Sequence, residues 1–203
     1  MKVKLCGMYR PEDITYVNEV QPDYVGFVFY EKSHRAVTAK QAREFRKNLD
    51  PKIRTVGVFV DEDPKTIIEL LEEGTLDAAQ LHGSETEEDI QYLQAVCHKP
   101  VIKAVKVRDR YDVEAWLDSS ADYLLFDNGM GTGETFDWSV LGGIDREFFL
   151  AGGLHPENLT AAMETVRPYG VDISSGIESD RKKDPEKMRR IMELVERYRE
   201  NTD

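Results

Sequence analysis

The sequence predicts a closed barrel of eight parallel strands surrounded by helices, a single-domain (β/α)8 TIM barrel. Short apolar and β-branched runs alternate with helical periods throughout the 203 residues. Such alternation indicates parallel strands joined by right-handed crossovers. Eight complete units, beginning on a strand and ending on a helix, favour a closed barrel over an open doubly wound sheet. No linker or low-complexity tract interrupts the series, so we expect one domain over residues 1–203.

Each strand is expected where a short apolar run lies between polar turns. In chain order, the expected strands are Val3–Cys6, Tyr24–Phe29, Thr55–Val60, Ala78–Leu81, Val101–Val107, Tyr123–Phe126, Phe148–Ala151 and Gly170–Ile173. Helices are expected where apolar side chains recur at helical spacing. In chain order, the expected helices are Pro11–Val20, Ala39–Asn48, Pro64–Glu73, Glu85–Val96, Val113–Leu117, Trp138–Leu141, Pro156–Val166 and Pro185–Glu200.

Capping signals mark several of these helix ends. Proline stands at the first helical position, where its missing N–H costs nothing, in Asp63-Pro64, His155-Pro156 and Asp184-Pro185. Thr38 with Gln41, and Ser84 with Glu87, have the spacing of a capping box. Gly74 is placed to end the third helix. These signals support the alternating pattern.

The chain is acidic, with 27 Lys and Arg against 39 Asp and Glu and a formal net charge of −12. Nucleic acids and anionic membranes bind cationic surfaces, so the charge excludes both as general partners. The longest apolar runs are short, such as the seven residues Tyr24–Tyr30, whereas a membrane helix needs about 20. The first residues lead into a predicted strand without a secretion signal, and two cysteines form no disulfide framework. We therefore expect a cytoplasmic protein.

In this architecture the active site lies at the C-terminal ends of the strands. Cys6 ends the first strand and Asp127 follows the sixth, so the two lie across the barrel mouth from each other. A thiolate and a carboxylic acid in these places suit proton removal and proton delivery at two atoms of one substrate. The alternatives are a small buried side chain for Cys6 and a helix cap for Asp127.

Other strand-end residues add to this picture. Side-chain alternation places Lys4 on the face of Cys6, and Asp172 on the neighbouring eighth strand, which predicts a Lys4–Asp172 ion pair inside the barrel. A cation so close would favour the Cys6 thiolate. His82 is placed as a base, as a hydrogen-bond donor or as an inert loop histidine. No His, Cys and carboxylate spacing resembles a zinc site, so we expect a mechanism without a metal.

Glycine-rich loops follow the last three strands. Gly152-Gly153 and Ser175-Gly176 follow the seventh and eighth strands, where this fold commonly binds phosphate through backbone N–H groups. The alternative is that these glycines only form tight turns. The segment Gly129-Met130-Gly131-Thr132-Gly133 does not have the spacing of a dinucleotide-binding loop. The ligand expected is therefore a small phosphorylated molecule.

Several motifs, taken in order along nearly the whole chain, resemble the phosphoribosylanthranilate isomerase family of tryptophan biosynthesis. They are Lys4-Leu5-Cys6-Gly7, Gly26-Phe27-Val28-Phe29, Ser33-His34-Arg35, Val56-Gly57-Val58-Phe59, Gln80-Leu81-His82-Gly83, Gly131-Thr132-Gly133 with Phe136-Asp137-Trp138, Leu150-Ala151-Gly152-Gly153-Leu154, and Gly170-Val171-Asp172-Ile173-Ser174-Ser175-Gly176-Ile177-Glu178. The resemblance implies an Amadori rearrangement of N-(5′-phosphoribosyl)anthranilate to 1-(2-carboxyphenylamino)-1-deoxyribulose 5-phosphate, the third step from chorismate, without a cofactor.

The resemblance also implies roles for individual residues. Cys6 would be the general base that removes the C2′ proton, and Asp127 the general acid that protonates the ribose ring oxygen. Arg35 would contact the anthranilate carboxylate, and His82 would line the pocket. The four loop residues that would hold the phosphate are Gly152, Gly153, Ser175 and Gly176. Asp127 must donate a proton, so partial burial is expected to raise its pKa.

Three departures and two alternatives accompany the resemblance. Met130 and Glu134 replace the residues usual in the family after the sixth strand, and Met8-Tyr9 replaces the usual Ile-Thr. One alternative is a histidine-pathway phosphoribosyl isomerase or a bifunctional relative, which would typically carry a carboxylate in place of Cys6. The other is a non-catalytic phosphate-binding barrel, which has no need of an opposed thiol and acid. A monomer or a homodimer is expected.

Overall fold

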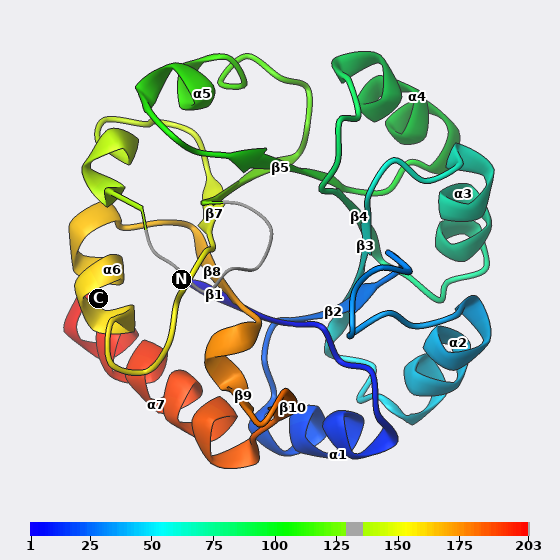
Figure 1. Ribbon diagram of the computed structural model, residues 1–203, viewed down its shortest axis with the longest axis horizontal. Coiled ribbons are helices and arrows are strands. Elements are labelled where there is room, and N and C mark those ends of the chain that lie inside the picture. Colours follow the sequence, from blue (N-terminus) through cyan, green and yellow to red (C-terminus); the bar gives the residue numbers. More distant parts are fainter. Residues whose placement is uncertain (129–135, 203) are drawn as a thin grey trace.

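The computed structural model describes residues 1–128 and 136–202 and confirms the closed barrel (Figure 1). Its eight strands follow one another in chain order around the barrel, and the eighth pairs in parallel with the first. The strands are β1 (Lys2–Cys6), β2 (Tyr24–Val28), β3 (Arg54–Phe59), β4 (Ala78–Leu81), β5 (Val101–Lys106), β6 (Tyr123–Asp127), β7 (Phe148–Leu150) and β8 (Gly170–Ile173).

Helices surround the barrel on its outer side (Figure 1). The α-helices are α1 (Pro11–Val20), α2 (Ala39–Asn48), α3 (Pro64–Glu72), α4 (Glu87–Cys97), α5 (Arg110–Glu114), α6 (Leu159–Val166) and α7 (Pro185–Thr202). Two short 3-10 helices, η1 (Trp138–Leu141) and η2 (Ser175–Ile177), lie before β7 and after β8. A small antiparallel hairpin, β9 (Glu178–Ser179) and β10 (Lys182–Lys183), follows η2 and lies between the barrel and α7 in the view of Figure 1.

The apolar side chains form two separate cores. The larger core lies between the strands and the helices, where side chains from both are buried. The smaller core fills the barrel and consists of Tyr24, Val56, Ala78, Ile102, Ala104, Leu125, Phe149 and Ala151. The rings of Tyr24 and Tyr123 pack edge-on against Phe149, with centroids 5.7 and 5.6 Å apart. Strand alternation explains the division, because successive side chains point to opposite faces.

A polar layer lies among the inward-facing side chains closer to the C-terminal ends of the strands. Lys4, Gln80 and Asp172 are buried on β1, β4 and β8, with exposed fractions of 0, 1 and 8%. Lys4 and Asp172 are register partners in adjacent strands, which places their side chains on the same inward face. Burying a charge without a partner is costly, so the charged members of this layer are expected to pair with each other.

Most of the predicted element boundaries are confirmed, and the errors have local causes. Helix α4 begins after Thr86, which forms a capping box with Asp89, so the expected box at Ser84 is wrong. Helix α6 begins only at Leu159, because the side chain of Asn158 accepts from His155 N at 2.9 Å and holds the preceding residues in turns. Pro156 is therefore outside the helix.

The helix between β5 and β6 starts three residues before the predicted Val113. Asp109 caps it, since its side chain accepts hydrogen bonds from Tyr111 N and Asp112 N. The predicted capping box of Thr38 and Gln41 and the proline starts at Pro64 and Pro185 are confirmed. In the described part of the chain, no helix has both the length and the apolar composition required to cross a membrane.

Candidate active site

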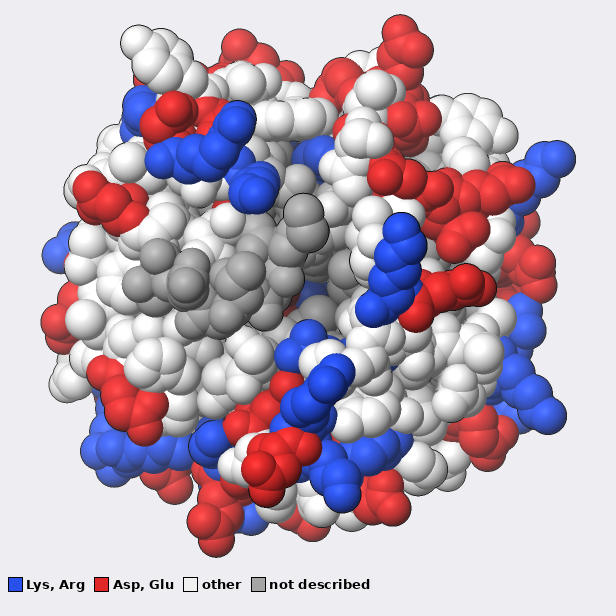
Figure 2. Space-filling view, in the orientation of Figure 1, with Lys and Arg blue, Asp and Glu red and all other residues white. Residues whose placement is uncertain are grey.

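The C-terminal ends of the strands surround a hollow at the centre of one face of the molecule (Figure 2). Lys and Arg side chains lie close to this hollow, whereas many of the acidic side chains lie farther out. Cys6 ends β1 and Asp127 ends β6, so both catalytic candidates belong to this end of the barrel. Two strands, β7 and β8, separate β1 from β6 on the shorter way around.

Cys6 is buried, with an exposed fraction of 6%, and its position depends on its neighbour in β2. Gly26 is the register partner of Cys6. A Cβ atom at Gly26 would lie 2.5 Å from Cys6 Sγ, so a larger residue would displace the thiol. The Ser174 hydroxyl donates to the Cys6 carbonyl at 3.1 Å and joins this strand end to the end of β8.

The predicted ion pair inside the barrel is confirmed. Lys4 Nζ donates to Asp172 Oδ2 at 2.9 Å, with both side chains buried. Burial alone would lower the pKa of Lys4, but the negative charge of Asp172 and the hydrogen bonds to Asp172 and Cys6 outweigh it and raise that pKa. Lys4 therefore remains a cation beside the thiol.

The expected stabilisation of the Cys6 thiolate is outweighed by burial. Burial has the largest influence and raises the pKa of Cys6, and the charge of Asp172 acts in the same direction. The charges of Lys4 and Lys183 lower it without reversing the shift. Cys6 is consequently a thiol at neutral pH, and its thiolate is a strong base when it forms.

Asp127 has a histidine beside it. His82 Nε2 lies 3.4 Å from Asp127 Oδ2, and His82 Nδ1 lies 2.9 Å from Gln80 Nε2. Gln80 and Asp127 are both buried. The His82 ring thus lies between a buried amide on β4 and the carboxylate that ends β6.

The loops after β7 and β8 pack directly against each other. A Cβ at Gly176 would overlap the Leu154 carbonyl oxygen, so the close approach of the two loops requires glycine there. Gly153 has a left-handed φ of 62°, and its carbonyl accepts from Asn158 Nδ2 at 2.9 Å. Within the described residues, no acceptor for the N–H groups of Gly153 and Ser175 is found, which leaves these donors for an anion.

Close packing against the end of β6 requires glycine at Gly152, in addition to its expected place in a phosphate loop. A Cβ at this position would lie 2.7 Å from Asp127 Oδ1 and 2.9 Å from Asn128 N. The loop after β7 therefore packs against the carboxylate that ends β6. Its φ of 86° also lies in the left-handed region.

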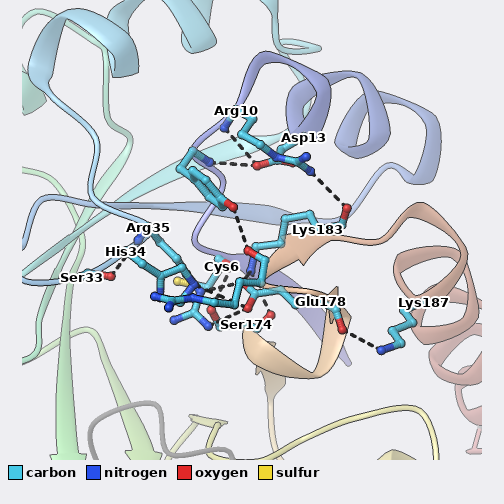
Figure 3. Close-up of polar contacts among 12 residues, drawn as sticks. Cys6, Arg10, Asp13, Ser33, His34, Arg35, Ser174, Glu178, Lys183 and Lys187 are labelled. Atoms are coloured by element: carbon cyan, nitrogen blue, oxygen red, sulfur yellow. Dashed lines mark hydrogen bonds and ion pairs between the residues drawn. The ribbon is translucent and has the colours of Figure 1, made fainter.

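Arg35 lies in a charged cluster on the Cys6 side of the mouth (Figure 3). Its Nε and Nη2 atoms donate to the two carboxylate oxygens of Glu178 at 2.6 and 2.9 Å. Lys183 Nζ lies 2.7 Å from Glu178 Oε1 and donates to the Ser174 carbonyl at 2.9 Å. Two cations thus share one carboxylate, which leaves excess positive charge beside Cys6.

Burial and charge act in opposite directions on this cluster. Burial alone would raise the pKa of Glu178, but hydrogen bonds from Arg35 and the charge of Lys183 lower it to about 2. Burial lowers the pKa of Lys183, and the charge of Glu178 offsets only part of that effect. Glu178 is therefore ionised throughout the neutral range.

Gln80, Glu178 and Lys183 are site residues that the sequence prediction did not single out. The alternation that places Gln80 on the face of His82 was the available signal for the first. Glu178 and Lys183 lie in the charged segment Glu178–Lys183, whose composition is typical of a solvated loop. Only the pairing of β9 with β10 turns these side chains towards Arg35.

Part of the predicted mouth lies outside the described residues. The motif Gly131-Thr132-Gly133 and the departures at Met130 and Glu134 all belong to residues 129–135. Among residues 1–128 and 136–202, no group of three or more His, Cys, Asp or Glu side chains is arranged to hold a metal ion.

Comparisons with known proteins agree with this geometry. A sequence model of the family "N-(5'phosphoribosyl)anthranilate (PRA) isomerase" matches residues 3–194. The N-(5'-phosphoribosyl)anthranilate isomerase of Caldanaerobacter subterraneus subsp. tengcongensis is 44% identical over 202 residues, covering 96% of this chain and 98% of that protein.

Two crystal structures of such isomerases have closely similar folds. The Thermus thermophilus enzyme superposes with a TM-score of 0.89 at 34% identity, covering 98% of this chain and 100% of the other. A second enzyme, in complex with reduced 1-(o-carboxyphenylamino)-1-deoxyribulose 5-phosphate, gives a TM-score of 0.86 at 37% identity, covering 97% and 98%. The chain belongs to the N-(5'-phosphoribosyl)anthranilate isomerase family.

Proposed function

We propose that this enzyme converts N-(5′-phosphoribosyl)anthranilate into 1-(2-carboxyphenylamino)-1-deoxyribulose 5-phosphate in tryptophan biosynthesis, with Asp127 as general acid and Cys6 as general base. The observation that carries these roles is the placement of a buried thiol and a buried carboxyl group at the ends of β1 and β6. A substrate held in the mouth would present its ring oxygen to Asp127 on one side and its C2′–H to Cys6 on the other.

Asp127 acts in the ring-opening step. Its carboxyl proton passes to the ribose ring oxygen as the bond from that oxygen to C1′ breaks. The lone pair of the anthranilate nitrogen forms a C1′=N double bond, so the nitrogen carries the positive charge and Asp127 is left as a carboxylate. Proton donation avoids an alkoxide leaving group, and positioned acids of this kind contribute about 10²- to 10⁴-fold to a rate.

Cys6 acts in the second step. Its thiolate removes the C2′ proton, and the C–H electron pair forms a C1′=C2′ double bond while the C=N electrons return to nitrogen. The resulting enol becomes the C2′ ketone by losing its hydroxyl proton and gaining a proton at C1′. The substrate nitrogen stores the electron pair, so the scheme needs no cofactor. Burial makes the Cys6 thiolate more basic, which suits removal of a carbon-bound proton.

Arg35 and the two glycine loops are proposed to hold the ends of the substrate. A planar guanidinium pairs well with a carboxylate. Arg35 is bound to Glu178, but Lys183 contacts the same carboxylate, so the cluster keeps an excess positive charge that attracts the anthranilate carboxylate. The backbone N–H groups of the loops that contain Gly152, Gly153, Ser175 and Gly176 would bind the phosphate. Binding at both ends places the reacting carbons between Cys6 and Asp127.

The assignment is accompanied by expectations about partners, cellular location, domain organisation and oligomeric state. The partner is a small phosphorylated molecule, and the acidic surface supports the expectation that nucleic acid and membranes are not partners. We place the enzyme in the cytoplasm, as a single domain over residues 1–203. A monomer or a homodimer is expected, and sedimentation at several protein concentrations would distinguish them.

A fluorescence assay tests the activity. N-(5′-phosphoribosyl)anthranilate is generated in situ, and the loss of its anthranilate-type fluorescence is followed with and without the protein. We expect strong acceleration. A folded chain that produces none would overturn the assignment, and conversion of the histidine-pathway substrate in its place would support the sister isomerase.

A further inference from the structure

We propose that Gln80 is a positioning residue that sets the tautomer of His82, so that the ring presents Nε2–H to Asp127. The proposal deepens the proposed function, because it rests on Asp127 as the general acid. Neither Gln80 nor His82 gives or takes a proton in this scheme. Their function is to control which oxygen of Asp127 carries the proton.

The contact between Gln80 and His82 determines where the ring proton lies. Gln80 Nε2 lies 2.9 Å from His82 Nδ1, and the amide nitrogen of glutamine is only a donor. The ring nitrogen facing it must therefore accept. A neutral imidazole carries one N–H, so the proton is left on Nε2.

The position of the Gln80 side chain is rigid. Gln80 is 1% exposed on β4, and its strand is paired on both sides, with β3 and with β5. Its Oε1 atom is buried and has no hydrogen-bond partner among the described residues. A leucine of similar size would avoid this unpaired oxygen, so stability alone gives no reason for an amide here. The reason lies in the contact of Nε2 with the ring.

The other side of the ring faces the acid. His82 Nε2 lies 3.4 Å from Asp127 Oδ2, which is long for a strong hydrogen bond and short enough for an N–H dipole to act on the carboxyl group. A donor at Oδ2 disfavours a proton on that oxygen and favours it on Oδ1. Oδ1 is the oxygen that packs against the loop after β7 at Gly152, on the side of the mouth where the phosphate is expected.

The same arrangement assists the step after proton donation. When Asp127 has protonated the ring oxygen, its carboxylate faces a fixed N–H donor that needs no reorganisation. Preorganised donors lower the free energy of developing charge more than mobile ones do. With the proton on Nδ1, the ring would present a lone pair to the carboxylate and would disfavour the charge.

Nitrogen NMR of the ring tests the proposal without relying on activity. The chain has four histidines, so the His82 signals are identified as those that disappear in His82→Asn. At mildly alkaline pH, long-range ¹H–¹⁵N correlations of the ¹⁵N-histidine-labelled enzyme should show Nε2–H for His82. An Nδ1–H pattern in the wild-type enzyme would overturn the proposal.

Two substitutions extend the test to catalysis. Gln80→Glu replaces the donor by a carboxylate that accepts, so the ring should carry its proton on Nδ1, and kcat should fall about tenfold or more while KM changes little. Gln80→Met keeps the volume and removes the donor, so both tautomers should appear and kcat should fall by a smaller factor. If Gln80→Met kept the single Nε2–H form and the wild-type kcat, Gln80 would have no positioning role.

A matched control and one further variant separate the possible failures. Gln41→Glu makes the same chemical change on α2, where Gln41 Oε1 only accepts from Thr38, so fold and activity should be unchanged. Circular dichroism verifies that each variant folds. If Asp127→Asn kept full activity, the proposed acid would be wrong, whatever the NMR spectrum. If Asp127→Asn were inactive and Gln80→Glu fully active, only the positioning role would be wrong.

Discussion

Burial and neighbouring charge act in opposite directions on Cys6, and burial has the larger effect. Lys4 and Lys183 favour the thiolate, whereas burial and the charge of Asp172 favour the thiol. The net shift raises the pKa of Cys6. At neutral pH only a small fraction of Cys6 is the thiolate, but that thiolate is a strong base. Such a base suits a carbon acid that a neighbouring iminium has already activated.

Removing the charge of Asp172 should make Cys6 more reactive. In a Cys97→Ser background, Asp172→Asn is expected to raise the rate constant for alkylation of Cys6 by iodoacetamide at neutral pH about three- to tenfold. The thiolate would then replace Asp172 as the counter-ion of Lys4. The Cys97→Ser protein alone is the control, and its thermal unfolding is compared with that of the double variant. An unchanged or slower reaction would show that Asp172 does not oppose the thiolate.

Residues on strand ends were predictable from the sequence, and residues that depend on loop packing were not. Cys6, Asp127 and the Lys4–Asp172 pair follow from strand alternation and from the closure of β8 onto β1. The pKa of Cys6 does not follow from them, because burial is a property of the assembled barrel. The bidentate contact between Arg35 and Glu178 joins residues 143 positions apart in the sequence and follows from no local pattern.

At the scale of elements, the β9–β10 hairpin connects the end of β8 with the loop after β2. Glu178 binds Arg35 and Lys183, and the Tyr9 hydroxyl donates to the Arg181 carbonyl at 2.7 Å. The sequence indicated neither strand, since each has only two residues and the segment is highly charged. Apolar patterning reveals strands that bury one face, and this hairpin is held together by ion pairs.

Glu178 should make the hairpin sensitive to acid. Its pKa is lowered from 4.5 to about 2, so its contribution to stability is complete above pH 4.5 and is lost as the pH falls towards about 2. Glu178→Gln should lower the free energy of unfolding at neutral pH by about 3 kcal/mol, because Arg35 and Lys183 lose their shared anion. Between pH 4.5 and about 2, the stability of this variant should fall less steeply than that of the wild type.

Urea unfolding at several pH values measures both effects. Glu31→Gln is the control, because Glu31 is exposed and the same charge is removed. Equal pH slopes for Glu178→Gln and the wild type would contradict the assigned ion pairs.

The turn of the hairpin contains two residues in the left-handed region. Asp180 and Arg181 have φ values of 50° and 63°, the pattern of a type I′ turn, in which glycine is favoured. Arg181→Gly should raise Tm by about 2–4 °C, because a left-handed conformation costs a residue with a Cβ about 1 kcal/mol. The contact with Tyr9 uses the main-chain carbonyl and is retained.

Lys182→Gly provides the matched control for differential scanning calorimetry. This neighbour lies in β10 and has no left-handed φ, so the added backbone freedom should lower Tm. A lower Tm for both variants would show that the turn is not strained.

At the scale of the whole molecule, the net charge of −12 and the anionic substrate are compatible because positive side chains lie close to the hollow. The outer parts of the face in Figure 2 carry both acidic and basic side chains. Eight units in 203 residues leave little room for insertions, and both groups assigned to catalysis end strands. Because the units are short and the catalytic groups end strands, the barrel and its opposed thiol and acid could be predicted from the sequence.

The role of Asp127 as general acid is tested by the kcat of Asp127→Asn for N-(5′-phosphoribosyl)anthranilate. Asparagine keeps the shape of the side chain and removes the transferable proton, so folding and substrate binding should be retained. We predict a fall in kcat of about 10²- to 10⁴-fold with a KM within a few-fold of wild type. A folded Asp127→Asn enzyme that turns over at the wild-type rate would show that Asp127 is not the general acid.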